Sequence, residues 1–182
     1  IPRTVSILLS GSSLALAGLI MQQMMQNKFV SPTTVGTMEW AKLGILISLI
    51  FFPKGHILIK LLFSVGLSLA GTYLFVKLIN LIRVKEVIFV PLLGIMIGGI
   101  VSSFTTFIAL RTNALQSIGN WMNGNFAIIT SGRYEVLYLV VPLLIIAFIF
   151  ANHFTIAGMG KDFSHNLGVS YEKIINIALF IT

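Results

Sequence analysis

Cysteine is absent from this sequence of 182 residues, and acidic side chains number only five. Without cysteine the chain can form no disulfide, thioether-linked haem, iron–sulfur ligation or thiolate zinc site. Charged residues make up 9% of the chain, whereas a soluble domain carries about 25%. Hydrophobic residues make up 57%, more than a soluble fold of this length can hide from water. Lipid is therefore expected to surround most of the chain.

The shortage of acidic residues leaves a net charge of +7, which raises the question of a nucleic-acid partner. The twelve basic residues, however, are scattered singly between apolar runs and form no clustered stripe of the kind that phosphate binding requires. They are typical of the flanks and loops of membrane spans. We therefore expect a lipid bilayer, and no nucleic acid, as the partner of this surface.

Long uncharged runs predict an all-α fold, a polytopic membrane helical bundle. No charge occurs between Arg3 and Lys28, a length that crosses a hydrocarbon core of ~30 Å at ~1.5 Å per residue. Similar runs recur along the chain. The expected spans are approximately residues 4–26, 35–52, 57–79, 87–110 and 134–150, with the start of another from residue 171.

Three features interrupt this pattern. The span at 35–52 is short unless it includes Glu39 and Lys42, which can pair at their i,i+3 spacing. Pro142 is expected to kink the span at 134–150. The stretch after Arg111 is too polar to face lipid, and it predicts a short polar helix at approximately 113–119 followed by a loop.

The basic residues give a weak prediction of orientation. Counted on alternate sides of the expected spans they divide seven to five, which assigns the loops with Lys28, Arg83 and Lys161 to the cytoplasm. The chain begins at Ile1 and its last residues, 174–182, are apolar to the end. We expect it to be an internal fragment of a longer protein.

No motif in the sequence supports catalysis. There is no phosphate-binding lysine loop, no pair of carboxylates at helical spacing and no nucleophile beside a base. His56 and His153 do not lie at ligand spacing from His165. We therefore expect no enzyme activity, no metal site and no cofactor in this chain.

Small side chains recur at every fourth residue of the span at 87–110, and two interpretations remain open. The residues are Gly94, Gly98, Ser102 and Thr106. They fit plain helix packing in lipid, and they fit equally a translocation path. Both hold if an interface between two copies of the protein also lines the passage.

Three segments, in this order, resemble the permease family of iron-siderophore, haem and cobalamin importers. The first is the small-residue helix Gly11–Gln22 with the loop that follows it, Asn27–Gly36. The second, Trp121–Phe126, is similar to the Trp-x-x-Gly-Ser/Gly motif of the family. The third, Gly158–Val169, resembles the cytoplasmic Leu-Gly…Leu-Gly-Val segment of these permeases.

The resemblance covers essentially the whole chain and implies a bundle of the cobalamin-permease type, in the bacterial cytoplasmic membrane. The chain would be part of a subunit of roughly ten spans. The implied function is transport of iron-siderophore complexes as the permease of an ATP-binding-cassette importer. The implied partners are a cytoplasmic ATP-binding subunit, an extracellular or periplasmic siderophore-binding protein and a second permease copy, either identical or a paired homologue.

The third segment is expected to be the coupling element that docks on the ATP-binding subunit. It spans approximately residues 157–169, and its expected coupling residues are Gly160, Lys161, Asp162, His165, Leu167 and Gly168. A solvated loop is the plainer interpretation of such a polar stretch, and the resemblance outweighs it. Leu167 is expected to be the apolar contact.

The loop at 27–36 departs from the common pattern of the family. Asn27 is followed by Lys28 and Phe29 where the family commonly has Pro-Leu, and Glu39 and Lys42 follow in place of small residues. These departures resemble the branch that handles catecholate-type siderophores such as petrobactin. The rival function is an ion-coupled secondary transporter or channel, which would need acidic groups within its spans. A structural scaffold would leave all three motifs unexplained.

Overall fold

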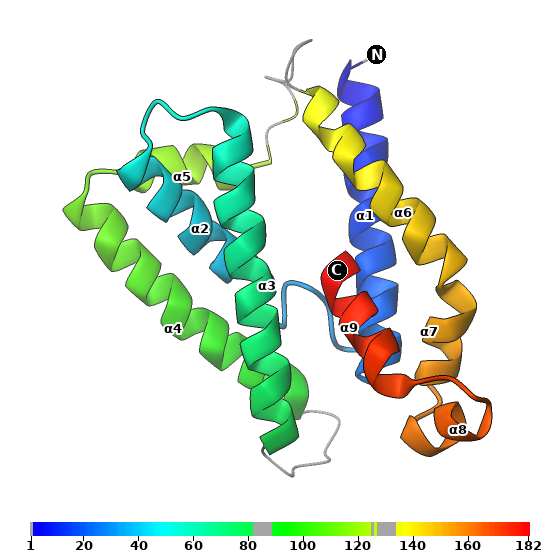
Figure 1. Ribbon diagram of the computed structural model, residues 1–182. Helices are drawn as coiled ribbons and strands as arrows, with labels where there is room; N and C mark the ends of the chain where they lie inside the picture. Colours follow the sequence, from blue (N-terminus) through cyan, green and yellow to red (C-terminus); the bar gives the residue numbers. More distant parts are fainter. Residues whose placement is uncertain (1, 82–88, 125, 127–133) are drawn as a thin grey trace. The chain divides into compact units, whose positions relative to one another are not determined.

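The computed structural model describes residues 2–81, 89–124, 126 and 134–182, and within them all regular secondary structure is helical. The prediction of an all-α bundle is confirmed. Expectations that concern residues 82–88 and 127–133, including Arg83 and Arg133, lie outside the described residues. The elements, shown in Figure 1, are α1 (Pro2–Met24), α2 (Thr37–Phe51), α3 (Ile57–Leu81), α4 (Phe89–Arg111), α5 (Leu115–Met122), the 3₁₀ helix η2 (Tyr134–Leu139), α6 (Val140–Ile149), α7 (Ala151–Ala157), α8 (Lys161–Asn166) and α9 (Tyr171–Ile181).

The chain divides into two compact units. Unit 1 consists of residues 1–32 and 125–182 and contains α1 and all helices from η2 onward. Unit 2 consists of residues 33–124 and contains α2 to α5. Because unit 1 is built from both ends of the chain, unit 2 is an insertion between α1 and η2.

Three helices in the described part of the chain are long and apolar enough to cross a membrane. They are α1, the stretch 57–79 of α3 and the stretch 91–111 of α4. A fourth crossing results if η2, α6 and α7 form one broken span. Large apolar side chains on these helices face outward, for example Leu8 at 66% and Ile100 at 70% exposure. This distribution suits a protein solvated by lipid.

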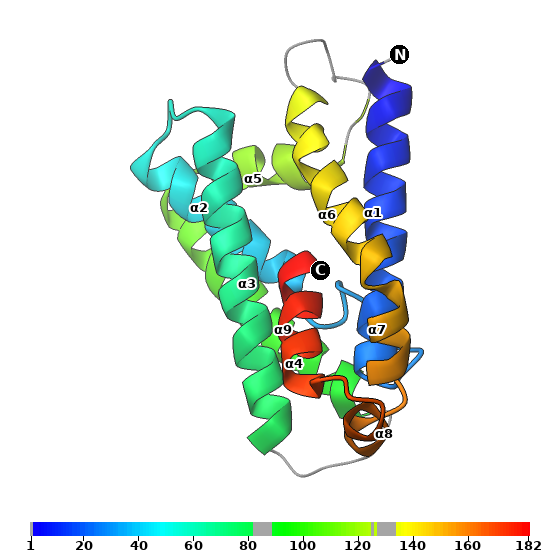
Figure 2. The ribbon, with the colours of Figure 1, turned by 45° about the vertical axis from the view of Figure 1, so that its right-hand side comes forward.

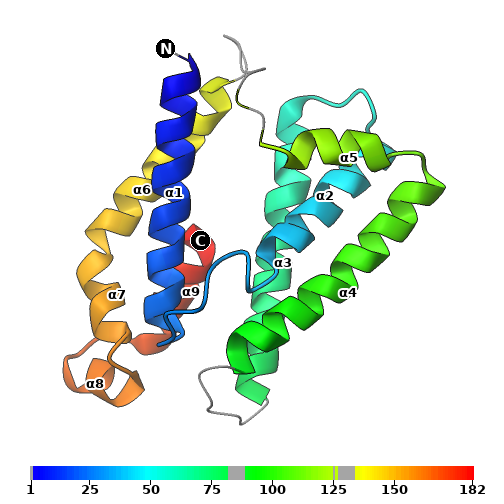
Figure 3. The same ribbon diagram turned by 180° about the vertical axis from the view of Figure 1, so that it is seen from behind.

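Unit 2 is held together by close helix packing around α2. Gly44 of α2 lies against the backbone of α3, where an added Cβ would come within 2.7 Å of Ser64 Cα. Gly71 of α3 lies against the indole ring of Trp40. Leu46, Ala109 and Ile118 form a buried cluster that joins α2, α4 and α5. In Figure 3, α5 crosses the end of unit 2 at which α2 and α4 finish and α3 begins.

The short polar helix begins later and ends later than the expected range 113–119. Asn113 adopts a left-handed conformation, with φ of 53°, which Asn tolerates better than most residues. This conformation ends α4 at Arg111 and delays the start of α5 to Leu115. The helix then continues to Met122, because burial of Ile118 and packing of Met122 stabilise its inner face.

Unit 1 forms a bundle in which α6, α7 and α9 pack along α1. Its core joins residues from four helices: Ile20, Met24, Ala147, Phe154, Ala157, Ile174 and Ala178. The polar connector expected after residue 152 therefore begins as a helix, since Phe154 and Ala157 belong to this core. Figure 2 shows α7, α8 and α9 following one another at the end of the unit where α1 finishes.

The span expected at 134–150 is broken, but not at Pro142. The axis bends by 57° between Ile149 and Ala151. Pro142 lies in the first turn of α6, where a backbone N–H has no intrahelical partner and its loss causes no kink. The residues before it, Tyr134–Leu139, wind as a 3₁₀ helix.

Candidate functional site

The candidate coupling segment is a short helix bracketed by two glycines in unit 1. Gly160 precedes α8 with φ of 110° and ψ of 168°, a conformation that is essentially restricted to glycine. Gly168 follows α8 with φ of 73°, the left-handed conformation that commonly ends helices. The predicted coupling residues Gly160 and Gly168 therefore define the turns on either side of α8.

One buried hydroxyl holds this turn closed. Ser164 Oγ lies 2.8 Å from the carbonyl oxygen of Gly160 and 3.3 Å from that of Ile156, at the end of α7. Ser164 is fully buried. The backbone N–H of Val169 donates to the carbonyl oxygen of Ser164 at 2.8 Å, which closes the far end of α8. These bonds give the segment a compact shape.

The outer face of the segment combines charged and apolar side chains. Lys161, Asp162 and His165 are exposed. Leu167 is 57% exposed, and so are Met159 at 57% and Phe163 at 61%. We name Met159, Phe163 and Leu167 the apolar triad; they recur at four-residue spacing. Sequence analysis selected only Leu167. Met159 lies before the turn at Gly160 and outside α8, so helical spacing gave no signal that the three belong together.

The segment is attached to the end of α1. The side-chain amide of Gln26 donates from Nε2 to the carbonyl oxygen of Gly158 at 3.2 Å. An open hollow of about 600 Å³ lies beside this bond, lined in part by Gln22, Lys28 and Met159. The basic-residue count assigned the Lys28 and Lys161 loops to one side of the membrane, and the structure places both at one end of unit 1.

The small-residue row of α4 divides into two parts in unit 2. Gly94 and Gly98 are buried against the turn that precedes α2, and Gly98 also faces Glu39. These two glycines therefore permit close packing within the unit. Ser102 and Thr106 are half-buried, and Thr106 Oγ1 donates to the Ser102 carbonyl oxygen at 2.8 Å.

The expected ion pair in the short span is present. Lys42 Nζ lies 3.7 Å from Glu39 Oε2, with both residues on α2. Within the described residues, Glu39 Oε2 and the neighbouring Trp40 Nε1 are buried atoms without a hydrogen-bond partner. No sequence pattern indicates the Trp40 environment, because the packing of Trp40 on Gly71 depends on the tertiary arrangement.

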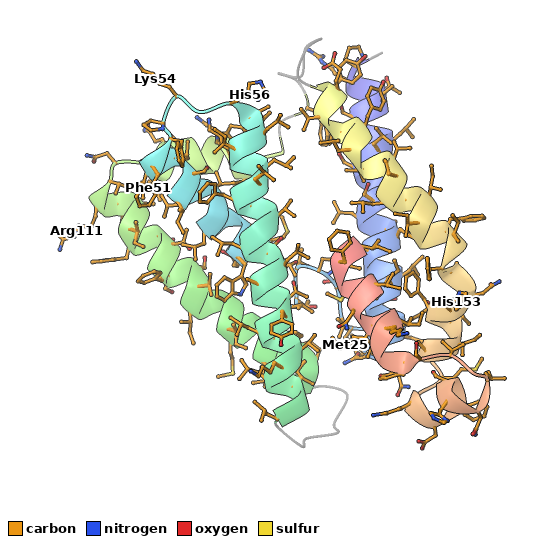
Figure 4. The ribbon with its side chains drawn as sticks, viewed as in Figure 1. Met25, Phe51, Lys54, His56, Arg111 and His153 are labelled. Atoms are coloured by element: carbon orange, nitrogen blue, oxygen red, sulfur yellow. The ribbon has the colours of Figure 1, made fainter. Side chains whose placement is uncertain are left out.

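A second cationic contact involves the tryptophan motif. Lys60 Nζ lies 4.9 Å from the centre of the Trp121 ring, a cation–π geometry that joins α3 to α5. Lys54 and His56 lie at the same end of unit 2, as Figure 4 shows. In the part of the chain that the structure describes, no group of three or more His, Cys, Asp or Glu side chains could hold a metal ion.

A solved structure of a metal-chelate type ABC transporter in an inward-facing conformation has the same fold. The two superpose with a TM-score of 0.76 at 18% sequence identity, over 99% of this chain and 58% of the other. At this level of identity the likeness concerns the fold.

Sequence comparisons give closer relatives. The chain is 51% identical over 181 residues to the petrobactin import system permease protein YclN of Bacillus subtilis (strain 168), covering 100% of this chain and 57% of that protein. It is 39% identical over 175 residues to the petrobactin import system permease protein FatD of Bacillus anthracis, covering 96% and 52%. It thus spans little more than half the length of these relatives. The model of the FecCD transport family matches residues 1–182, and the chain belongs to this family.

Proposed function

We propose that the full protein is the permease subunit of an ATP-binding-cassette importer that carries iron complexes of catecholate-type siderophores across the bacterial cytoplasmic membrane. The observation that carries this proposal is the 51% identity, over the whole chain, to a permease of petrobactin import. The same relationship favours a siderophore-binding protein and a cytoplasmic ATP-binding subunit as partners. The iron complex is cargo, and the permease itself performs no covalent chemistry.

The coupling segment supplies the contact through which ATP hydrolysis acts. The apolar triad presents three large side chains that water surrounds in the isolated chain, and burial of such side chains drives protein association. Lys161, Asp162 and His165 are exposed on the same segment and set the charge pattern of the contact. Gly160 and Gly168 allow the chain to turn sharply at both ends of α8. The segment is therefore compact, and α8 moves as one body with the partner.

The translocation path is formed where two permease copies meet. Ser102 and Thr106 keep polar groups half-exposed on an otherwise apolar helix, which suits a passage for a hydrophilic chelate. Gly94 and Gly98 contribute indirectly, because they fix α4 against the turn before α2. A second copy, identical or homologous, completes the wall of the passage.

Transport assays on proteoliposomes test the function. The full-length permease with its ATP-binding subunit and binding protein should take up iron-loaded petrobactin when ATP is supplied on the ATPase side. Uptake should persist after the ion gradients are collapsed. Uptake driven by a gradient without ATP would instead identify an ion-coupled transporter. Uptake of ferric citrate in preference to petrobactin would overturn the substrate class.

A bulky substitution on α4 tests the path. Ser102→Leu should reduce uptake roughly tenfold, because overpacking or occlusion at a half-buried position costs about 1–3 kcal/mol. Ser103→Leu is the matched control, since Ser103 is exposed on a different face of the same turn. Initial uptake rates at equal permease levels make the comparison. Equal rates for Ser102→Leu and Ser103→Leu would remove this face of α4 from the path.

A further inference from the structure

Gln26 adopts an unusual backbone conformation at the end of α1. Its φ is 49°, and in the described part of the chain only Asn113 shares a positive φ among residues other than glycine. Asn is enriched in this region of φ/ψ space, whereas Gln has no such preference. A residue held in this conformation points to a local constraint. The constraint here is the left-handed turn that ends α1, which is closed by hydrogen bonds from the Gln26 N–H to the Gln23 carbonyl oxygen and from the Asn27 N–H to the Gln22 carbonyl oxygen.

The Gln26 side chain contacts the beginning of the coupling segment. Its Nε2 donates to the Gly158 carbonyl oxygen at 3.2 Å, across a sequence separation of 132 residues. The same nitrogen would lie 3.3 Å from a Cβ added at Gly160. The Gln26 amide therefore lies against both glycines that flank Met159, at the point where α7 ends and α8 begins.

The Gln26 backbone belongs to the tight turn that leads out of α1. Its N–H donates to the Gln23 carbonyl oxygen at 3.2 Å. In the next residue, Asn27 Oδ1 accepts a hydrogen bond from the Phe29 N–H at 2.9 Å, and the Val30 N–H donates to the Asn27 carbonyl oxygen at 3.2 Å. Asn27 and Val30 are both buried. The turn at residues 26–30 is thus held by these hydrogen bonds and by two buried side chains, with Gln26 at its start.

We propose that Gln26 is a positioning residue that links the coupling segment to the turn at residues 26–30. When the ATP-binding subunit moves α8, the bond between Gln26 and Gly158 carries that displacement to the end of α1 and into the chain that leads to α2. This inference rests on the proposed function. It adds a polar route for the displacement, beside the packing of α7 and α9 on α1 in the core of unit 1.

Replacement by glycine separates this role from a contribution to stability. Glycine adopts positive φ without steric cost, so Gln26→Gly retains the turn and removes only the amide. The bond is exposed, and the loss of about 1 kcal/mol is a small part of the stability of a folded domain. We expect the melting temperature of the full importer to fall by no more than about 2–4 °C and basal ATP hydrolysis to stay unchanged. Chelate transported per ATP hydrolysed should fall about fivefold, which corresponds to the loss of one ordinary hydrogen bond.

Gln23→Ala is the matched control. Gln23 lines the same hollow, and its backbone carbonyl, which the substitution keeps, is the group that bonds Gln26. Transport per ATP should be unchanged in this variant. Gln26→Glu, which places a carboxylate against the Gly158 carbonyl oxygen, should lower the ratio at least as far as Gln26→Gly. An unchanged ratio in Gln26→Gly, or an equal fall in Gln23→Ala, would overturn the proposal. Failure of the unmodified importer to transport any ferric siderophore would instead reject the proposed function.

Discussion

Leu167→Asp in the full-length permease should leave membrane insertion intact and abolish association with the ATP-binding subunit. Leu167 is 57% exposed, so a carboxylate there stays hydrated in the isolated permease and the fold is preserved. In the complex the same carboxylate would be buried within the apolar triad without a partner, which costs several kcal/mol. Copurification of the ATP-binding subunit, ATP hydrolysis with loaded binding protein and siderophore-dependent growth should all be lost.

Charge alone should not produce this result. Asn166→Asp adds the same charge one residue away, on an exposed side chain outside the apolar triad, and should retain most of the association. Charge reversal at Lys161 or Asp162 should also have smaller effects, because charges at the rim of a contact mainly alter association rates. A Leu167→Asp complex that kept its ATPase subunits and hydrolysed ATP in response to loaded binding protein would show that this segment is not the coupling element.

Gly94→Ala should be the most destabilising of the conservative substitutions in unit 2. A Cβ at this position would overlap the Thr34 carbonyl oxygen and lie 3.0 Å from Val35 Cα. Both are backbone atoms, which cannot rotate away as a side chain can. Overpacking of this kind costs about 1–3 kcal/mol or more, against a gain of about 1 kcal/mol in helix propensity. The melting temperature of the detergent-solubilised variant should fall clearly. Its purification yield should fall as well.

Gly98→Ala is the matched control, four residues further along the same face of α4. A Cβ there would meet Gly36 Cα at 3.4 Å and Glu39 Cγ at 3.7 Å, which are ordinary van der Waals distances. Its melting temperature should stay close to that of the unmodified protein or rise. If the two alanine variants unfolded at the same temperature, the turn before α2 would not be packed on Gly94 as described.

The sequence predicted the membrane helices best where charge is absent over a long run. The runs at 4–26 and 87–110 correspond to α1 and α4 within a few residues, because the cost of burying charge in lipid limits where a span can end. The position of the break at Phe150 had no such signal. Neither proline nor glycine occurs there, and Phe154 and Ala157, which follow the bend, pack into the core of unit 1.

The candidate site was predictable in its chemistry and not in its connections. Gly160 and Gly168 are among the coupling residues expected from the sequence, and both adopt positive φ in the structure. The sequence did not indicate that the small-residue row of α4 has two parts with different surroundings. Only the fold shows that the Thr34–Gly36 turn lies against Gly94 and Gly98. The contact between Gln26 and Gly158 joins residues 132 positions apart, a separation over which local patterns carry no information.

The 3₁₀ winding of η2 changes the reach of the broken span. The stretch Tyr134–Ile149 has six residues in η2 and ten in α6. As a continuous α-helix these residues would extend for ~24 Å, at ~1.5 Å per residue. With a rise of ~2 Å per residue in the 3₁₀ part, the stretch reaches ~27 Å, close to the hydrocarbon thickness of ~30 Å. The stretched winding thus brings sixteen residues close to the length of a membrane crossing before the bend at Phe150 turns the chain into α7.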